Sequence, residues 1–233
     1  MKNYKKNLEL LTKNFVYSKE MEHDACGVGL IASTEGKKSR AIVEHGIEAL
    51  KAVWHRGAVD ADGKTGDGAG IHVEIPKDFF IEKIQVTGHD YDSSEICVGM
   101  IFLPRNDYSA QENCKTIVES ELTKNNFSIY GWRQVPVNPK VLGEKALQTM
   151  PEIIQVLFKS NNPNLLDKNL ERKIYETRKR IENKAFDASL NNFYICSISS
   201  KSIIYKGLYL AEAISDFYLD LKDTRFVSRY AIF

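Results

Sequence analysis

The sequence lacks long hydrophobic runs, and it lacks an excess of charge of either sign. No apolar stretch approaches the roughly 18 residues that a membrane helix needs. The 233 residues include 32 Lys and Arg against 31 Asp and Glu, a net charge of +1. Such a balance gives no electrostatic reason to expect nucleic acid or a membrane as a partner. Apolar residues still make up 43% of the chain, enough for a packed core.

The sequence also lacks a secretory signal. A signal peptide needs an uninterrupted apolar stretch of about 7–15 residues. Residues 1–25 offer only LELL, and lysines and acidic residues surround it. We therefore predict a cytoplasmic protein in which the segment before Cys26 serves a different purpose.

Cysteine is scarce, and no two cysteines form a C-x-x-C motif. The cysteine spacings of zinc ribbons and thioredoxins are therefore excluded. Cys97 and Cys196 lie in strand-like apolar segments and are predicted to be core residues. Cys114 lies on a predicted helix, and its sequence context indicates no functional role. The five histidines form neither H-x-x-x-H nor H-E-x-x-H, so we predict no metal site.

Hydrophobic periodicity predicts intermixed helices and strands, an α/β or α+β chain. Helices are expected at 39–57 (N-cap Ser39, stop Gly57), 76–84, 109–126, 141–150, 165–186 and 208–221. Buried or alternating strands are expected at 28–33, 71–75, 95–103, 127–137, 152–160 and 225–233, with a hairpin over 191–207. Within 127–137 we expect Trp132 in the core and Arg133 in solvent. Because the chain stops at Phe233 inside an apolar strand pattern, we expect the sequence to be truncated.

The stretch MEHDACGVGLI (21–31) places Cys26 before two glycines and an apolar strand. Free cysteines are commonly small buried hydrophobes. The alternative is a nucleophile, which needs a base. One of the five histidines could serve: His23, His45, His55, His72 or His89. Cleavage before Cys26 would instead free an α-amine with a pKa of about 7.7–8.0 beside the thiol.

A second stretch, WHRGAVDADGKTGDGAGI (54–71), joins a helix end to a glycine-rich loop and a strand. Arg56 suits a two-point clamp on a carboxylate, or else a surface salt bridge. The loop is not a P-loop, because G-x-x-x-x-G-K-[ST] is absent, and it is not a dinucleotide-binding turn, because it leads into a strand. Asp67 within it fits an ammonium group, or else an ordinary turn.

Together these features resemble the amidotransferase domain of the glutamate synthase large-subunit family, a class II, N-terminal-nucleophile type of domain. The resemblance rests on Cys-Gly before a strand, then HRGA, then DGKTGDGAGI. GWRQVPV, LGEKALQTMPEIIQV, FYICSISSKSIIYKGLYL and FYLDLKDTRFVSRYAIF agree with it. The resemblance extends from about residue 20 to Phe233. These segments resemble that family rather than the amidotransferases of purine, glucosamine or asparagine synthesis.

The resemblance implies that residues 1–25 are a propeptide and that 26–233 are the N-terminal part of the domain. Cys26 would attack the side-chain amide of glutamine, with its own α-amine as base. Arg56 would clamp the glutamine α-carboxylate, and Gly66, Asp67 and Gly68 would lie beside the substrate. His55 would orient the turn at Arg56. The implied fold is α+β, a four-layer α-β-β-α sandwich of the N-terminal-nucleophile hydrolase type, here incomplete.

The implied reaction is hydrolysis of glutamine to glutamate and ammonia through a thioester. Ammonia would pass to a synthase domain that aminates 2-oxoglutarate. The resemblance implies no cofactor on this chain, FMN and an iron–sulfur cluster in the remaining synthase domains, and a small electron-donating subunit as partner. The family's later asparagine–glycine pair, which builds the oxyanion hole, does not occur in these 233 residues. Alternatives are therefore an inactive remnant, a fragment completed by a second chain, or another class II amidotransferase.

Overall fold

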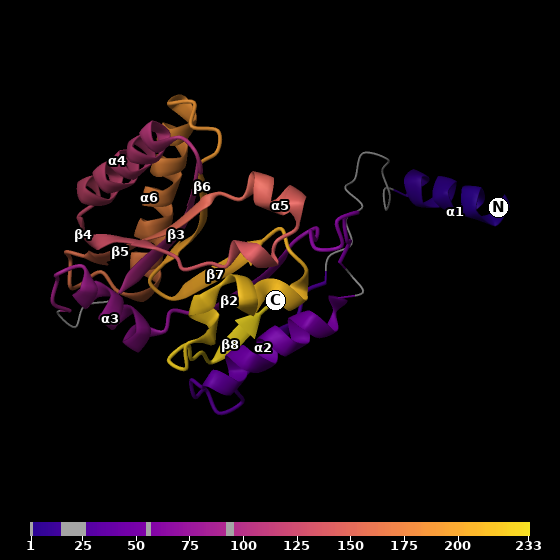
Figure 1. Cartoon of the computed structure of the whole chain (residues 1–233), viewed down its shortest axis with the longest axis horizontal. Helices are drawn as coiled ribbons and strands as arrows, with labels where there is room; N and C mark the ends of the chain where they lie inside the picture. The colour runs from indigo at the N-terminus through magenta and orange to yellow at the C-terminus, as the bar shows by residue number, and fades with distance from the viewer. Residues whose placement is uncertain (1, 15–26, 55–56, 92–95) are drawn as a thin grey trace.

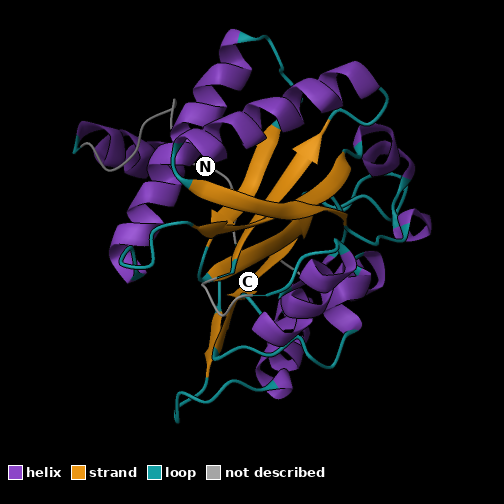
Figure 2. Cartoon of the chain, turned by 90° about the vertical axis from the view of Figure 1, so that its left-hand side faces the viewer, coloured by secondary structure: helices purple, strands orange, loops and turns teal. Residues whose placement is uncertain are grey.

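The computed structural model describes residues 2–14, 27–54, 57–91 and 96–233 (Figure 1). Within these ranges the chain is a mixture of helices and antiparallel strands, as the sequence predicts. Figure 2 shows the strands gathered in the middle, with helices on both sides of them. No helix in these ranges is long and apolar enough to cross a membrane.

Two four-stranded sheets form the centre of the chain, and every described strand pair is antiparallel. The first sheet has the order β1 (Leu30–Ala32), β8 (Tyr230–Ile232), β2 (Ala69–Glu74) and β7 (Ser202–Gly207). The second has the order β4 (Phe127–Gln134), β5 (Glu152–Ser160), β3 (Cys97–Leu103) and β6 (Tyr194–Ser199). The first sheet thus joins strands from both ends of the sequence.

The segment 191–207 forms two strands, but they do not form the predicted hairpin ladder. β6 pairs with β3 in the second sheet, and β7 pairs with β2 in the first. They contact each other through a side chain instead, because the backbone N–H of Ile204 donates to Ser197 Oγ over 3.2 Å. The chain therefore crosses from one sheet to the other at Ser200 and Lys201.

Most helices occur where periodicity predicts them, with two differences in extent, whereas the helix Lys2–Lys13 is not predicted. Their bounds are α1 (Lys2–Lys13), α2 (Arg40–Ala52), α3 (Lys77–Val86), α4 (Tyr108–Lys124), α5 (Glu144–Thr149), α6 (Asp167–Asp187) and α7 (Ile214–Phe217), with the 3₁₀ turns η2 (Pro139–Val141), η3 (Ala211–Ala213) and η4 (Leu219–Lys222). Ser39 caps α2 as predicted, accepting from the N–H of Ile42. That helix ends at Ala52, before Gly57, because Val53 leaves helical geometry. The predicted helix 208–221 is three short turns.

One apolar cluster lies between α4, α6 and the second sheet. α4 contributes Cys114, Val118 and Leu122, and α6 contributes Leu170, Ile174 and Ile181. Alternate residues of β3, Cys97, Ile101 and Leu103, meet them. Tyr175 of the same helix is 59% exposed, although it follows the buried Ile174. The helical repeat places Thr177, and not Tyr175, among the buried residues of α6.

A larger cluster joins α2 and the first sheet to the opposite face of β3. Val43, Ile47 and Leu50 of α2 are buried in it. Gly46 lies so close to β8 that a Cβ there would come within 2.5 Å of Ala231 Cβ. Figure 1 shows α2 on the far side of the strands from α4 and α6. This packing holds β1 and β8 beside the glycine-rich loop.

The predictions for the cysteines are confirmed, and the one for β1 is wrong. Cys97 and Cys196 are buried, and burial raises the pKa of the Cys196 thiol to about 11. β1 is not a buried strand, since Leu30 is 62% exposed. It is an edge strand that pairs with β8 alone among the described residues. β8 itself covers only part of the strand predicted over 225–233.

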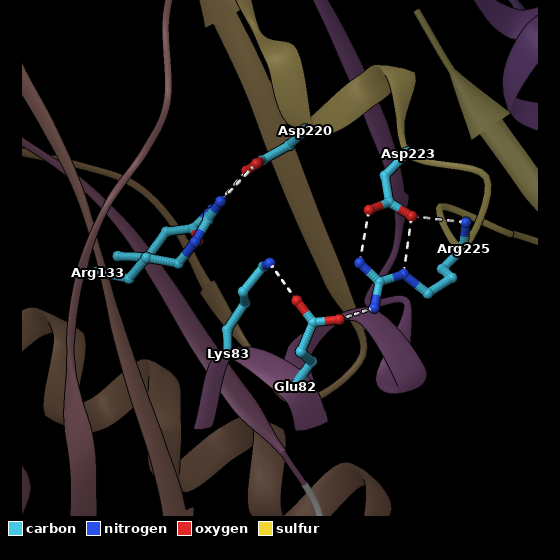
Figure 3. A network of polar contacts seen from close by, with 7 residues as sticks. Glu82, Lys83, Arg133, Asp220, Asp223 and Arg225 are labelled. Carbon is cyan, nitrogen blue, oxygen red and sulfur yellow. Dashed lines mark hydrogen bonds and ion pairs between the residues drawn. The ribbon is translucent and has the colours of Figure 1, made fainter. Parts of the chain in front are cut away.

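A buried ion pair contradicts the prediction that Arg133 faces solvent. Its guanidinium donates to both carboxylate oxygens of Asp220, over 2.7 and 2.5 Å (Figure 3). Trp132 is only half-buried, and its indole N–H donates to Glu119. The β-bulge between Ile129 and Gly131 shifts the register of β4. The strand's period-2 pattern is interrupted there, so alternation does not give the faces that Trp132 and Arg133 occupy.

Candidate active site

The glycine-rich loop is a closed turn that leads into β2, as the sequence predicts. Val59 and Gly66 pair as an antiparallel bridge. Between them the N–H of Asp60 donates to the carbonyl of Thr65, and the N–H of Gly63 donates to that of Asp60. Gly63 has φ +70, a conformation that glycine adopts without steric cost.

Asp62 holds this turn together from within. Its Oδ1 accepts the N–H groups of Lys64 and Thr65, and its Oδ2 accepts the Thr65 hydroxyl over 2.6 Å. The Thr65 hydroxyl and these N–H groups hold the pKa of Asp62 well below its usual range. The sequence leaves a turn-forming role open for Asp67. In the structure it is Asp62 that stabilises the turn.

Asp67 follows the turn, and its position is fixed through the backbone. Its N–H donates to the carbonyl of Ala58 over 3.2 Å. A Cβ on Gly57 would come within 3.4 Å of Asp67 Oδ1. The carboxylate therefore lies beside the residue that follows Arg56. His55 and Arg56 themselves lie outside the described residues, and so does Cys26.

Glycine is required on both sides of Asp67, for a different reason at each position. A Cβ on Gly66 would come within 2.6 Å of the carbonyl oxygen of Tyr209. Gly68 has φ +133, which side chains rarely adopt. The chain just after β7 and the loop before β2 therefore meet backbone to backbone at Gly66, where a side chain would need a shift, whereas a side chain at Gly68 would strain the backbone.

A cavity of about 590 Å³ opens where β1, the loop and β7 meet. Its walls include Val28, Asp67, Gly68, His72, Lys206 and Phe233. Val28 comes two positions after Cys26. The structure thus brings the predicted loop residues Asp67 and Gly68 to the same cavity as the chain that leads into β1. A larger cavity of about 840 Å³ contains none of the predicted site residues.

Among the described histidines, only His72 lines the 590 Å³ cavity. Its Nε2 atom is buried and has no hydrogen-bond partner among the described residues. Burial lowers the pKa of this imidazole, which favours the neutral ring. His45 and His89 are exposed elsewhere on the chain. Within the described ranges no group of three or more His, Cys, Asp and Glu lies together in a way that could hold a metal ion.

Comparison with known proteins identifies the family. Residues 26–233 match the sequence profile of the family described as Glutamine amidotransferases class-II. This chain belongs to that family. The resemblance found from Cys26, HRGA and DGKTGDGAGI is thereby confirmed, and the matched segment begins at Cys26 itself.

Individual relatives of this amidotransferase chain are much longer proteins. It is 53% identical over 230 residues to the Glutamate synthase (NADPH) large chain of Azospirillum brasilense, an alignment that covers 99% of this chain and 15% of the relative. It is 39% identical over 214 residues to Ferredoxin-dependent glutamate synthase 1 of Arabidopsis thaliana, 91% of this chain and 13% of the relative. The chain thus spans about a seventh of the length of these relatives.

Sequence reasoning missed the residues that support the loop from outside. The N-terminus of α5 packs on the turn, and a Cβ on Gly143 would come within 2.3 Å of both Asp62 Oδ2 and Thr65 Oγ1. Lys145 of α5 forms an ion pair with Asp60 over 2.7 Å. The turn and α5 lie far apart in the sequence, with β3, α4 and β4 between them. No local pattern could have paired them.

Proposed function

We propose that this chain is the glutamine-hydrolysing part of a glutamate synthase. Two observations support the proposal. The family match begins at Cys26 and continues to Phe233. The relatives that align over nine-tenths or more of this chain are glutamate synthases of NADPH-dependent and ferredoxin-dependent types.

In this proposal Cys26 is the nucleophile. Its α-amine, freed by removal of residues 1–25, accepts the thiol proton. The thiolate attacks the side-chain amide carbon of glutamine, and the C–N bond breaks as the departing nitrogen takes a proton and leaves as ammonia. Water then attacks the thioester, which releases glutamate and returns the thiol.

The substrate's α-carboxylate is assigned to Arg56, because a guanidinium binds a carboxylate through two parallel hydrogen bonds. Gly66, Asp67 and Gly68 are assigned to the loop that lies beside the bound substrate. The observation that carries this assignment is the place of the Asp67 carboxylate. It lies beside Gly57, and Asp67 lines the cavity that also receives Val28, two positions after Cys26.

His55 is assigned to orienting the turn at Arg56. His72, although it lines the cavity, is not assigned a proton-transfer role, because the α-amine lies on the nucleophile's own Cα. For the fold, we propose the four-layer α-β-β-α arrangement of N-terminal-nucleophile hydrolases. The placement of α4 and α6 on one sheet and of α2 on the other is compatible with it.

The ammonia would serve a synthase domain that aminates 2-oxoglutarate. That chemistry needs electrons, which FMN and an iron–sulfur cluster would supply from the remaining synthase domains, fed by a small electron-donating subunit or by ferredoxin. The described residues offer no ligand cluster for iron, and these groups are assigned to the remaining synthase domains. We propose the cytoplasm as the site of the reaction.

The test is glutamine hydrolysis by the natural protein and by its Cys26→Ala variant. We expect the variant to lose glutamine-dependent activity and to keep any ammonia-dependent glutamate synthesis. Cys114→Ala is the matched control, because burial raises the pKa of that thiol to about 11 and keeps it protonated. Intact-mass analysis gives the N-terminus. Retained glutaminase activity in Cys26→Ala would overturn the proposal, and so would an active enzyme that begins at Met1.

A further inference from the structure

α5 begins against the glycine-rich loop, and the loop supplies the cap that this helix lacks. Gly143 stands at the N-cap and has no side chain to accept a hydrogen bond. The Thr65 hydroxyl oxygen accepts the backbone N–H of Ala146 over 3.3 Å instead. The N–H of Lys145 also faces the Asp62 carboxylate and lowers its pKa, in addition to the larger effect of Thr65. Such caps normally come from the residue before the helix.

The Thr65 hydroxyl is used in both directions. It donates to Asp62 Oδ2 over 2.6 Å and accepts from Ala146, so it joins the turn to the helix. Thr65 is 5% exposed. Without the hydroxyl, one buried N–H and one carboxylate oxygen would each lose a partner. The Asp62 carboxylate also interacts with both segments, and Lys145 and Asp60 add an exposed ion pair between them.

The contact between Gly143 and the turn is close-packed as well as hydrogen-bonded. A Cβ on Gly143 would come within 2.5 Å or less of Asp62 Oδ2, Thr65 Oγ1 and Thr65 N. The φ of Gly143 is −73, which any residue adopts, so the glycine is required for space and not for backbone conformation. A side chain at this position would push the turn away from the helix.

Thr65 directly precedes Gly66 and Asp67. Gly66 rests on the carbonyl of Tyr209, and Asp67 lines the 590 Å³ cavity. A displacement of Thr65 therefore moves the segment that the proposed function places beside the substrate. The contact with Tyr209 holds one side of this segment, and α5 holds the other.

We infer that Thr65, Asp62 and Gly143 form a latch that positions Asp67 for substrate binding, so that α5 sets the affinity of the site for its amino-acid substrate. These are positioning residues, because none of them is assigned a contact with substrate. The inference rests on the proposed function for its substrate. It adds to that function the element, distant in the sequence, that fixes the binding loop.

Three variants of the natural protein test the latch. Thr65→Val keeps the shape and removes the hydroxyl, Thr65→Ser restores the hydroxyl, and Gly143→Ala forces the joint apart. We expect the KM for glutamine to rise about 10-fold in Thr65→Val, the change expected for one lost hydrogen bond, and at least as much in Gly143→Ala. The kcat should stay within about twofold, and Thr65→Ser should match the parent.

Thr87→Val is the matched control, since the Thr87 hydroxyl donates to the carbonyl of Ile84 at the end of α3, away from the loop. It should leave KM unchanged. An unchanged KM in Thr65→Val would overturn the inference. Equal loss of kcat and thermal stability in Thr65→Val and Thr65→Ser would also overturn it, because that pattern means a role in folding alone.

Hydrogen exchange separates failure of the latch from failure of the proposed function. Amides of the peptide covering 57–70 should exchange faster in Thr65→Val and Gly143→Ala than in the parent or in Thr87→Val. If the parent does not hydrolyse glutamine, the proposed function fails, and exchange still decides whether the latch exists. Unchanged exchange in both loop variants would overturn it.

Discussion

Arg133 of β4 and Asp220 of η4 form a bidentate ion pair between the two sheets (Figure 3). The Asp220 side chain is 2% exposed and that of Arg133 is 13% exposed. Tyr205 of β7 donates its hydroxyl to Asp220 over 3.0 Å, and Gln155 of β5 accepts from Arg133. Although burial lowers the pKa of Arg133, the hydrogen bond and charge of Asp220 raise it above its usual value.

Removing one partner of this pair should destabilise the fold strongly. Arg133→Met leaves the Asp220 carboxylate buried without its cation, and breaking a buried pair in this way costs about 3–5 kcal/mol. We expect that loss in the free energy of unfolding, measured by urea denaturation. The double variant Arg133→Met/Asp220→Leu should recover part of it, because no buried charge is left unpaired. A single variant as stable as the parent would contradict the inferred role of the pair.

The pair also marks where prediction from the sequence stops. The strand β4 was predicted, because its apolar and β-branched residues are evident in the sequence. The bulge at Ile129 and Gly131 decides which way Arg133 points, and its local signal is a single glycine inside the strand. Likewise the turn between β6 and β7 was predicted, whereas their membership of different sheets depends on partner strands that are distant in the sequence. Periodicity indicates which residues are buried, but it does not indicate which other elements they pack against.

A second polar network should make stability sensitive to acid. Arg225 donates to Asp223 and to Glu82, which also accepts from Lys83 (Figure 3). Hydrogen bonds from Arg225 lower the pKa of both carboxyl groups to about 2. Their unfolded values are about 4.3 for Glu and 3.9 for Asp.

Because the folded-state pKa values lie below the unfolded ones, this contribution is fully present above about pH 4.5 and is lost as the pH falls toward about 2. The melting temperature should therefore decline over that window. Arg225→Gln should start lower and decline less steeply, since the two carboxyl groups then keep only the effect of Lys83, and their protonation removes less stabilisation. Melting curves at pH 6, 4, 3 and 2 measure this. Parallel curves for parent and variant would contradict the assignment.

Residue type and spacing select candidate site residues from the sequence, but they do not show which distant segments support them. Cys26, Arg56 and the loop Gly66–Gly68 stand out by residue type and spacing. Thr65 and Gly143 do not, because a threonine in a turn and a glycine before a short helix are ordinary until the two segments meet. The contact between Gly66 and the Tyr209 carbonyl is equally invisible in the sequence, as it joins backbone groups from opposite halves of the chain.

Arg56 gives the sharpest test of how the proposed substrate is held. Arg56→Lys keeps the positive charge and loses the planar two-point geometry, while Arg56→Ala loses both. We expect the KM for glutamine to rise about 10- to 100-fold in Arg56→Ala, as for hydrogen bonds to a charged group, and less in Arg56→Lys. The kcat should change little, because the clamp is remote from the reacting amide.

The specificity of that effect can be read from the substrate as well as from the enzyme. An amide lacking the α-carboxylate should be a poor substrate for the parent, and it should lose nothing further in Arg56→Ala, since the clamp then has nothing to hold. Arg172→Ala on the exposed face of α6, where the side chain pairs with Glu176, should match the parent with both substrates. If Arg56→Ala weakens both substrates equally, Arg56 acts on the fold of the site and not on the carboxylate.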